Sequence, residues 1–339
     1  MPHRFGRPVR SNHLLASFTD EASRLREFAP PFRFTSFFSP EDTLLCLCAS
    51  EAALAHARIP GSAAYTSHDG LRIADLTTGS GLVGLHLLRI ETGSTLLALD
   101  VDPVAIETAR GNAEFFGVHG RARFDCIDLW SETIVEALAG YRPHLITCNP
   151  PYVPEPKAGS LQLEAGAGED GTAHLMRAIE LTTAVRPRAL SLSWCSLSDP
   201  ARIVRETEAA GYILNSLFVV AIADGEYSGS VHDYLRSLPN AYISESDATI
   251  RELGPDGSAR FGYLLIAGEF SRERGARQRA TESETAVQRL CEGFAAHGVE
   301  ALINPIAPIP VRTWILDRWD ELRLRASLHG EISMATTPA

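Results

Sequence analysis

Four consecutive residues, Asn149-Pro150-Pro151-Tyr152, combine an amide, two prolines and an aromatic ring directly after the apolar run 144–148. An asparagine side chain and a proline carbonyl can accept hydrogen bonds from both N–H groups of a planar NH2 group. The prolines make the turn rigid, because each fixes its own φ and restricts the residue before it. The tyrosine ring can stack on the planar group. The tetrapeptide therefore predicts a clamp for an amide or amine nitrogen, with Asn149, Pro150 and Tyr152 as catalytic residues.

A nitrogen of this kind is a poor nucleophile, because its lone pair is delocalised into a π-system. Hydrogen bonds accepted from both N–H groups favour a pyramidal nitrogen and direct its lone pair at an electrophile. Catalysis then depends mainly on alignment and exclusion of water. The alternative is a rigid turn after a strand, in which Asn149 is an ordinary turn residue.

A glycine-rich turn follows an earlier apolar run at 71–76. Residues 79–84 have the pattern G-x-G-x-x-G, whose glycines let the backbone approach a ligand at a helix N-terminus. The next apolar run ends at Asp100, roughly 20 residues further on, where a carboxylate can accept both hydroxyls of a ribose. These features predict a nucleotide site, although a turn without a ligand and an NAD site would share them.

Two further acids end predicted strands. Asp75 ends the first strand, near the expected amino-acid end of a nucleoside cofactor, and Asp128 ends the third, where it could accept from an adenine amino group. Capping of the following helix is the alternative role for each. An NAD enzyme has no use for the clamp after the fourth strand. Together, the two sites predict an N-methyltransferase that depends on S-adenosylmethionine.

The elements that position these residues alternate between strand and helix patterns. This alternation predicts an α/β fold with a mostly parallel sheet covered on both faces. The first of two late strands, 212–221, is not directly followed by a helix pattern, which predicts that it forms an antiparallel pair with 261–267 at the sheet edge. The predicted strands are 71–76, 95–100, 124–127, 144–148, 189–194, 212–221 and 261–267. A helix is predicted before them at 41–58, and helices between them at 82–91, 103–116, 133–139, 172–184 and 200–210.

Changes in composition divide the chain into three parts. We expect an N-terminal segment at 1–45, a methyltransferase domain at 46–270 and a C-terminal extension at 271–339. Within the extension the pattern predicts a helix at 284–296, a strand at 300–304 and a helix at 311–327. The extension could cover the site or form a homodimer interface, and the sequence leaves both roles open.

Composition and charge limit the classes of partner and the cellular location that we expect. The net charge of −11 lowers the expectation for a nucleic-acid substrate, because affinity for phosphates depends on Lys and Arg. No apolar run is long enough to span a bilayer, and the N-terminal residues contain no apolar stretch of the length that a secretion signal has. The cysteines show no repeated pairs, which predicts reduced thiols, a cytoplasmic location and no metal site. They are Cys46, Cys48, Cys126, Cys148, Cys195 and Cys291.

Three segments resemble the protein-glutamine N5-methyltransferase family, whose best-known members methylate the GGQ glutamine of peptide release factors. FSPEDTLL at 38–45 is similar to the family's opening segment, and residues 100–113 are similar to its second motif. GAGEDG within 164–171 is similar to its glycine segment after the clamp. The chain departs from the family at Thr77, where Gly is usual, and at His144, where Asp is usual.

The resemblance implies the class I methyltransferase Rossmann-like fold, with a seven-stranded, mostly parallel sheet, helices on both faces and an antiparallel last strand, here followed by a C-terminal α/β extension. It implies that S-adenosylmethionine is the cofactor and that the acceptor is a protein, a peptide or a small molecule. The residues expected at the cofactor are Thr43, Asp75, Thr77, Thr78, Gly79, Gly81, Asp100, Val101, Asp128, Leu129 and Asn149.

Two other functions stay open. The same clamp could hold the amino group of a flipped adenine, as in an adenine-N6 methyltransferase acting on nucleic acid. The acidic composition argues against that function. A non-catalytic partner subunit with the same fold is the second alternative, and Thr77 is the residue that favours it.

Overall fold

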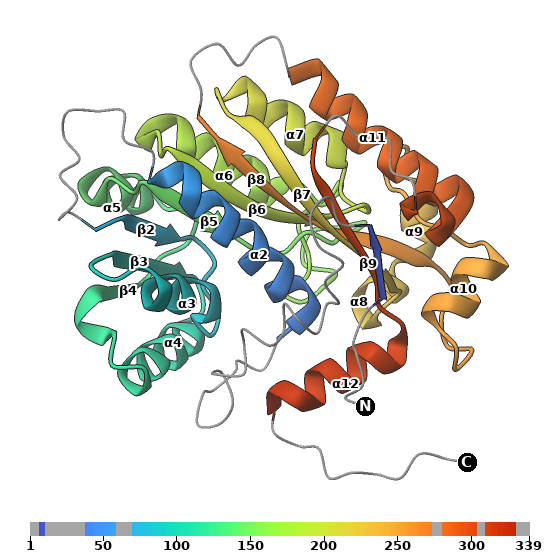
Figure 1. Ribbon diagram of the computed structural model, residues 1–339, viewed down its shortest axis with the longest axis horizontal. Helices are drawn as coiled ribbons and strands as arrows, with labels where there is room; N and C mark the ends of the chain where they lie inside the picture. The colour runs from blue at the N-terminus through green and yellow to red at the C-terminus, as the bar shows by residue number, and fades with distance from the viewer. Residues whose placement is uncertain (1–6, 11–37, 59–69, 273–279, 304–308, 330–339) are drawn as a thin grey trace.

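A nine-stranded sheet forms the centre of the molecule, in the order β1-β9-β7-β8-β6-β5-β2-β3-β4 (Figure 1). The computed structural model describes residues 7–10, 38–58, 70–272, 280–303 and 309–329. The strands are β1 (Arg7–Arg10), β2 (Arg72–Asp75), β3 (Thr95–Asp100), β4 (Ala122–Cys126), β5 (Leu145–Cys148), β6 (Ala189–Cys195), β7 (Ile213–Ala223), β8 (Gly262–Ser271) and β9 (Val311–Ile315).

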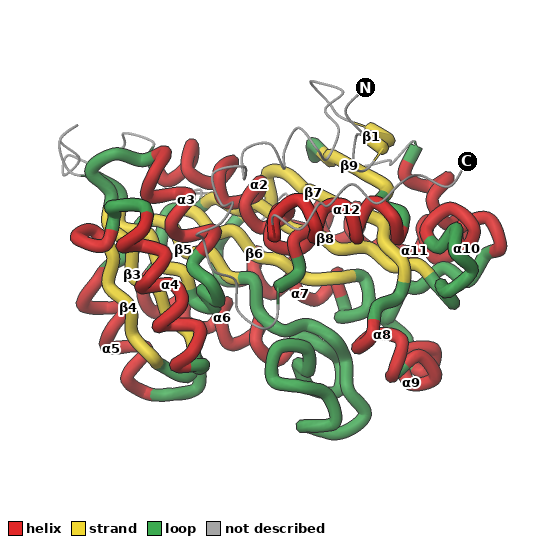
Figure 2. The backbone as a smooth tube through the Cα atoms, turned by 90° about the horizontal axis from the view of Figure 1, so that it is seen from below, coloured by secondary structure: helices red, strands yellow, loops and turns green. Residues whose placement is uncertain are grey.

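Helices lie on both faces of this sheet. Figure 2 shows α2 and α3 on one side and α5, α6 and α7 on the other. The α-helices are α2 (Pro40–Ala57), α3 (Leu82–Ile90), α4 (Pro103–Phe115), α5 (Glu132–Tyr141), α6 (Ala173–Val185), α7 (Pro200–Ala209), α8 (Glu226–Ser230), α9 (His232–Ser237), α10 (Asp247–Leu253), α11 (Ala280–His297) and α12 (Arg318–His329), and the short 3₁₀ helices are η2 (His119–Arg121) and η4 (Gly298–Leu302).

Strand directions match the predicted class. β4, β3, β2, β5 and β6 run parallel, and β8 is antiparallel to both of its neighbours, β6 and β7. This confirms the α/β class and the mostly parallel, doubly covered sheet with an antiparallel late strand. The described residues form nine strands rather than the expected seven, because β9 pairs in parallel with β7 and β1 pairs with β9. The antiparallel pair β7–β8 is therefore not at the sheet edge.

Alternation along each strand explains the two-sided core. On β3, Leu96 and Ala98 belong to one buried cluster, and Leu97 and Leu99 belong to the other. Successive side chains of a strand point to opposite faces, so an unbroken apolar run fits a strand that is buried on both sides. The first cluster packs under α2 and α3, and the second packs under α5, α6 and α7.

Predicted helix starts coincide with capping residues. Pro103 opens α4 as expected, and the Asp102 side chain accepts from the backbone N–H of Val104. Ser131 caps α5 by accepting from Thr133 N. Asp128 is therefore not the cap of α5, which was its alternative role.

The predicted C-terminal elements were partly wrong. Residues expected to form a strand at 300–304 belong mostly to the 3₁₀ helix η4, and the expected helix at 311–327 begins with a strand, β9, before α12. Leu217 pairs with Val311 and Ala221 with Ile315. Residues 311–315 therefore form a strand because they pair with the free edge of β7. Periodicity cannot separate a short apolar strand from a helical turn.

At the other end of the chain, β1 forms a strand within the expected N-terminal segment 1–45. Residues 1–6 and 11–37 of that segment lie outside the described residues. The expected boundary at residue 45 falls inside α2. Among the described helices, none combines the length and apolar character required to cross a bilayer.

Candidate active site

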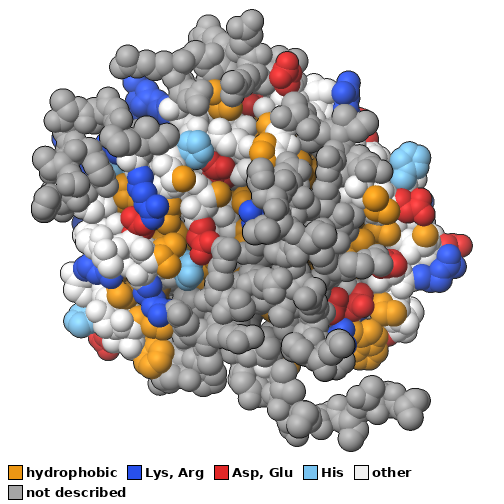
Figure 3. Space-filling model, in the orientation of Figure 1, with side chains coloured by type: hydrophobic (Ala, Val, Ile, Leu, Met, Phe, Trp, Pro, Cys, Tyr) orange, Lys and Arg blue, Asp and Glu red, His pale blue; other side chains and the backbone are white. Residues whose placement is uncertain are grey.

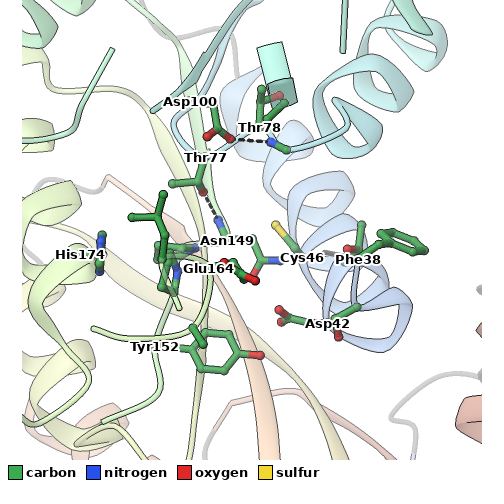
Figure 4. A pocket seen from close by; sticks show the side chains of 18 of the residues that line it. Phe38, Asp42, Cys46, Thr77, Thr78, Asp100, Asn149, Tyr152, Glu164 and His174 are labelled. Atoms are coloured by element: carbon green, nitrogen blue, oxygen red, sulfur yellow. Dashed lines mark hydrogen bonds between the residues drawn. The ribbon is translucent and has the colours of Figure 1, made fainter. Parts of the chain in front are cut away.

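A cavity of about 420 Å³ opens where β2, β3 and β5 end. This volume is in the range of small-molecule sites, and the carboxyl ends of parallel strands are where open α/β sheets bind ligands. The N-terminal part of α2 forms a second wall, and residues of β8 and α12 form a third. Figure 4 shows side chains from several of these elements turned toward a common space.

Asp100 organises the glycine turn. Its Oδ2 accepts from Gly79 N at 2.8 Å, the bond drawn as a dashed line from Asp100 in Figure 4. Its Oδ1 accepts from Asp102 N at 3.0 Å. Burial raises the pKa of Asp100, and these backbone donors oppose the shift. Each carboxylate oxygen can accept a second hydrogen bond. Asp100 can therefore hold the turn and still bind a diol.

Asp75 lies deeper, at the end of β2, with 3% of its surface exposed. Thr78 Oγ1 donates to Asp75 Oδ2 at 3.0 Å. Burial raises the pKa of Asp75 to about 7, and the Asp100 carboxylate adds to the shift while the Thr78 hydroxyl opposes it. The N-cap of α3 is Gly81 rather than Asp75. Two neighbouring acids in a buried site favour a ligand that brings positive charge.

The predicted clamp begins at Asn149, whose backbone N–H donates to Thr77 Oγ1 at 3.1 Å. Thr77 therefore fastens the clamp to the glycine turn, a contact that glycine could not make. The Asn149 side-chain Oδ1 is buried and has no hydrogen-bond partner among the described residues. A buried acceptor without a donor is costly, so this oxygen is available to a ligand N–H.

Asp42, on α2, lies beside the clamp. The Tyr152 hydroxyl points toward its carboxylate (Figure 4). Burial raises the pKa of Asp42 to about 7, the Glu41 carboxylate adds to the shift, and the Tyr152 and Asn149 side chains oppose it by stabilising the charge. Asp42 thus couples α2 to the clamp.

The cavity continues past β4, where Asp128, Leu129, Trp130 and His174 line it. Trp130 and His174 meet edge to face with ring centroids 4.7 Å apart, and Asp128 Oδ1 accepts from Trp130 N at 2.9 Å. Burial lowers the pKa of His174, although Asp128 opposes the shift. Together with Leu129, these residues could bind a planar base.

The structure gathers nearly all the predicted site residues around one cavity. Gly81 is the exception: it lies outside the lining, has φ +82°, and a Cβ there would meet Ala109 Cβ at 3.0 Å. It starts α3 and lets that helix approach α4. His144, a departure from the family, lies at the opposite end of β5. The predicted residues that line the cavity are Thr43, Asp75, Thr77, Thr78, Gly79, Asp100, Val101, Asp128, Leu129, Asn149, Pro150 and Tyr152.

Several lining residues were missed from the sequence. Asp42 could have been found, because it follows Glu41 in the first turn of a helix that continues with the apolar run 44–49. Glu321 and Arg325 carried no signal, because α12 reaches the cavity only after β9 has joined the sheet. Tyr227 and Tyr263 were also missed, because an aromatic residue near a late strand usually packs in the hydrophobic core.

Comparison with curated proteins gives a local similarity. A release factor glutamine methyltransferase from Chlorobaculum tepidum is 36% identical over 130 residues, which are 38% of this chain and 44% of that protein. One from Bradyrhizobium diazoefficiens is 40% identical over 93 residues, which are 27% of this chain and 29% of that protein. The chain thus spans less than half the length of these relatives. No protein-family model matches the chain.

Solved structures show a looser likeness. A ribosomal protein L11 methylase from Lactobacillus delbrueckii has a TM-score of 0.40 and 15% identity, covering 72% of this chain and 86% of that one. The Mtq2–Trm112 complex from E. cuniculi, which methylates the translation termination factor eRF1, has a TM-score of 0.37 and 16% identity, covering 69% and 96%. Likeness at this level carries no functional conclusion.

Proposed function

We propose that this protein transfers a methyl group from S-adenosylmethionine to an amide or amine nitrogen of its acceptor. The observation that carries the proposal is Asn149 Oδ1, a buried carbonyl oxygen in the wall of the cavity to which no described residue donates. The local similarity to glutamine methyltransferases supports the same chemistry.

The residues present fit the cofactor. Its adenosine would lie along the glycine turn, with the ribose hydroxyls donating to Asp100 and the adenine beside Asp128, Leu129 and Trp130. Its cationic methionine end would lie near Asp75, with Thr43, Thr77 and Thr78 around it. Val101 would cover the sugar. When bound, S-adenosylmethionine supplies an activated methyl group on a sulfonium centre.

The clamp then acts by alignment. Asn149 Oδ1 and the Pro150 carbonyl would accept from the two N–H groups of the acceptor, and the Tyr152 ring would pack on its planar face. Thr77 fixes the backbone of the clamp. Orientation of this kind can contribute several kcal/mol to lowering a barrier.

The acceptor is a protein, a peptide or a small molecule. The relatives act on a glutamine of a release factor, which makes a glutamine side chain the first acceptor to test. Figure 3 shows acidic, basic and apolar side chains interspersed over the described part of one face, and the net charge of −11 argues against a nucleic-acid acceptor. The homodimer and the cytoplasmic location stay predictions.

The proposal is tested by incubating the full chain with methyl-labelled S-adenosylmethionine and, separately, a release factor, a glutamine-containing GGQ peptide, duplex DNA and a metabolite extract. Label is expected in an N-methyl amide or amine of a non-nucleic-acid acceptor, identified by mass spectrometry. Binding of S-adenosylmethionine is measured alongside. Absence of binding, or labelling at oxygen, carbon or adenine, would contradict the proposal.

A further inference from the structure

The C-terminal helix α12 forms part of the cavity wall. Arg325 Nη2 donates to Glu41 Oε1 at 2.6 Å, and Arg325 Nη1 donates to the Phe38 carbonyl oxygen at 2.9 Å. These bonds hold α12 beside the N-terminal end of α2 (Figure 1). Glu321, one helical turn before Arg325, lines the same cavity. Helices from opposite ends of the chain therefore meet beside the clamp.

Three carboxylates at this junction each have one oxygen without a partner. Glu41 Oε2, Asp42 Oδ1 and Glu321 Oε1 are buried and make no hydrogen bond to any described residue. Glu41 is 3% exposed and Asp42 is 6% exposed. Buried carboxylate oxygens are normally paired, because leaving one unpaired carries its full desolvation cost. All three are acceptors, so what they lack is a donor.

Two arginines lie near these acids, and part of their donor capacity is used elsewhere. Arg325 donates to Glu41 and to a carbonyl, and the Nη2 of Arg318 donates to the Asp224 carbonyl oxygen, whereas Arg318 Nε is buried and has no partner among the described residues. Burial raises the pKa of Glu321, the Glu41 and Asp317 carboxylates add to the shift, and Arg318 and Arg325 oppose it. Crowded acids of this kind are stabilised by a further cation.

An organic cation fits better than a metal ion. Within the described ranges, no group of three His, Cys, Asp or Glu side chains is arranged to hold a metal. The Tyr263 ring lies close enough to Glu41 and Glu321 for their charges to raise its pKa further above the ordinary value than burial alone does. Tyr152 lies beside Asp42. Tyrosine faces attract ammonium and guanidinium groups.

We propose that Glu41, Asp42 and Glu321 form a subsite that binds a positively charged nitrogen group of the methyl acceptor. This inference rests on the proposed function and deepens it, because it names the acceptor's chemistry: a molecule or peptide with an ammonium or guanidinium group close to the nitrogen that is methylated. The C-terminal extension contributes Glu321 to this subsite and therefore takes part in acceptor selection.

Two probes of the same shape test the charge. Nα-acetyl-arginine amide carries a guanidinium group, and Nα-acetyl-citrulline amide replaces it with a neutral urea. Isothermal titration calorimetry measures the binding of each to the full chain, with and without saturating S-adenosylhomocysteine. The arginine probe is expected to bind about ten-fold more tightly or better, as charge-assisted hydrogen bonds do.

Two variants test whether the preference for the arginine probe depends on Glu321. Glu321→Gln keeps the shape of the side chain and is expected to reduce the preference to about three-fold or less, because it removes one of the carboxylates. Asp320→Asn, on the same helix but outside the cavity lining, is the matched control and should keep the full preference. An unchanged affinity for S-adenosylhomocysteine in both variants verifies that the fold is intact.

The outcomes separate the two proposals. Equal binding of both probes, no saturable binding of the arginine probe, or a preference that survives Glu321→Gln would overturn the subsite. Failure of S-adenosylhomocysteine to bind, together with a clear preference for the arginine probe, would overturn the methyltransferase and leave the subsite standing.

Discussion

The Asp42 carboxylate and the Asn149 side-chain amide lie next to each other in the cavity wall, one on α2 and the other after β5. An ionised carboxylate only accepts hydrogen bonds, so it favours the orientation in which the Asn149 NH2 group faces it. The Asn149 carbonyl oxygen is then left for the acceptor. Protonated Asp42 can instead donate to that oxygen and compete with the acceptor.

We expect Asn149→Ala to lower kcat by about 100-fold or more, because the clamp loses the acceptor oxygen that aligns the nitrogen. The affinity for S-adenosylmethionine should change little. Steady-state kinetics and calorimetry check the two parts separately. Asn215→Ala, on β7 and outside the cavity lining, serves as the control and should keep full activity. A fully active Asn149→Ala variant would rule out the clamp.

Asp100→Ala should weaken S-adenosylmethionine binding by about ten-fold or more, because it removes the carboxylate that accepts from Gly79 and that would accept from the ribose. The matched control is Asp125→Ala, an acid on β4 that does not line the cavity. Calorimetric titration of both variants measures the effect. Equal affinities in the two variants would show that Asp100 has no part in the site.

Transfer should depend on pH through Asp42. Because its pKa is raised to about 7, it is mostly protonated at pH 6 and ionised at pH 8. We expect kcat at saturating cofactor to fall as pH drops below 7, by about ten-fold per unit. Asp42→Asn cannot titrate, so its profile should be flat there, at a lower level.

A separate signal comes from Asp75, whose pKa is also raised to about 7. Its protonation should appear in the KM for S-adenosylmethionine, which should rise below pH 7, and not in kcat. If kcat of Asp42→Asn still falls below pH 7, that fall is caused by the titration of another group.

Two glycine substitutions should differ in their cost to stability. Gly79 and Gly81 both have positive φ, +52° and +82°, but a Cβ at Gly79 meets nothing within 4 Å, whereas one at Gly81 meets Ala109 Cβ at 3.0 Å. We expect Gly79→Ala to lower the free energy of unfolding by about 1 kcal/mol from backbone strain alone. Gly81→Ala adds a clash between α3 and α4 and should cost about 2–3 kcal/mol. Urea unfolding measures both, and an equal cost would contradict the packing role of Gly81.

Some of the site could be predicted because it is local. Asp75 and Asp100 end apolar runs, and parallel strands bring their carboxyl ends to one edge of a sheet, so the spacing alone placed them near Asn149. The glycine-rich turn could also be predicted, because its residues are neighbours in the sequence. The alternative capping role of Asp128 could be dismissed only once Ser131 was seen to cap α5.

The sequence by itself determined the alternation of strands and helices, the glycine turn and the clamp, because each is encoded by neighbouring residues. Only the tertiary structure decided that 311–315 is a strand, because that choice depended on the free edge of β7. The same pairing carries α12 to the N-terminal end of α2, where Glu321 lies close to Glu41 and lines the same cavity as Asp42. Contacts between residues so far apart in the chain leave no pattern in the sequence, since their energy comes from burial that exists only in the folded protein.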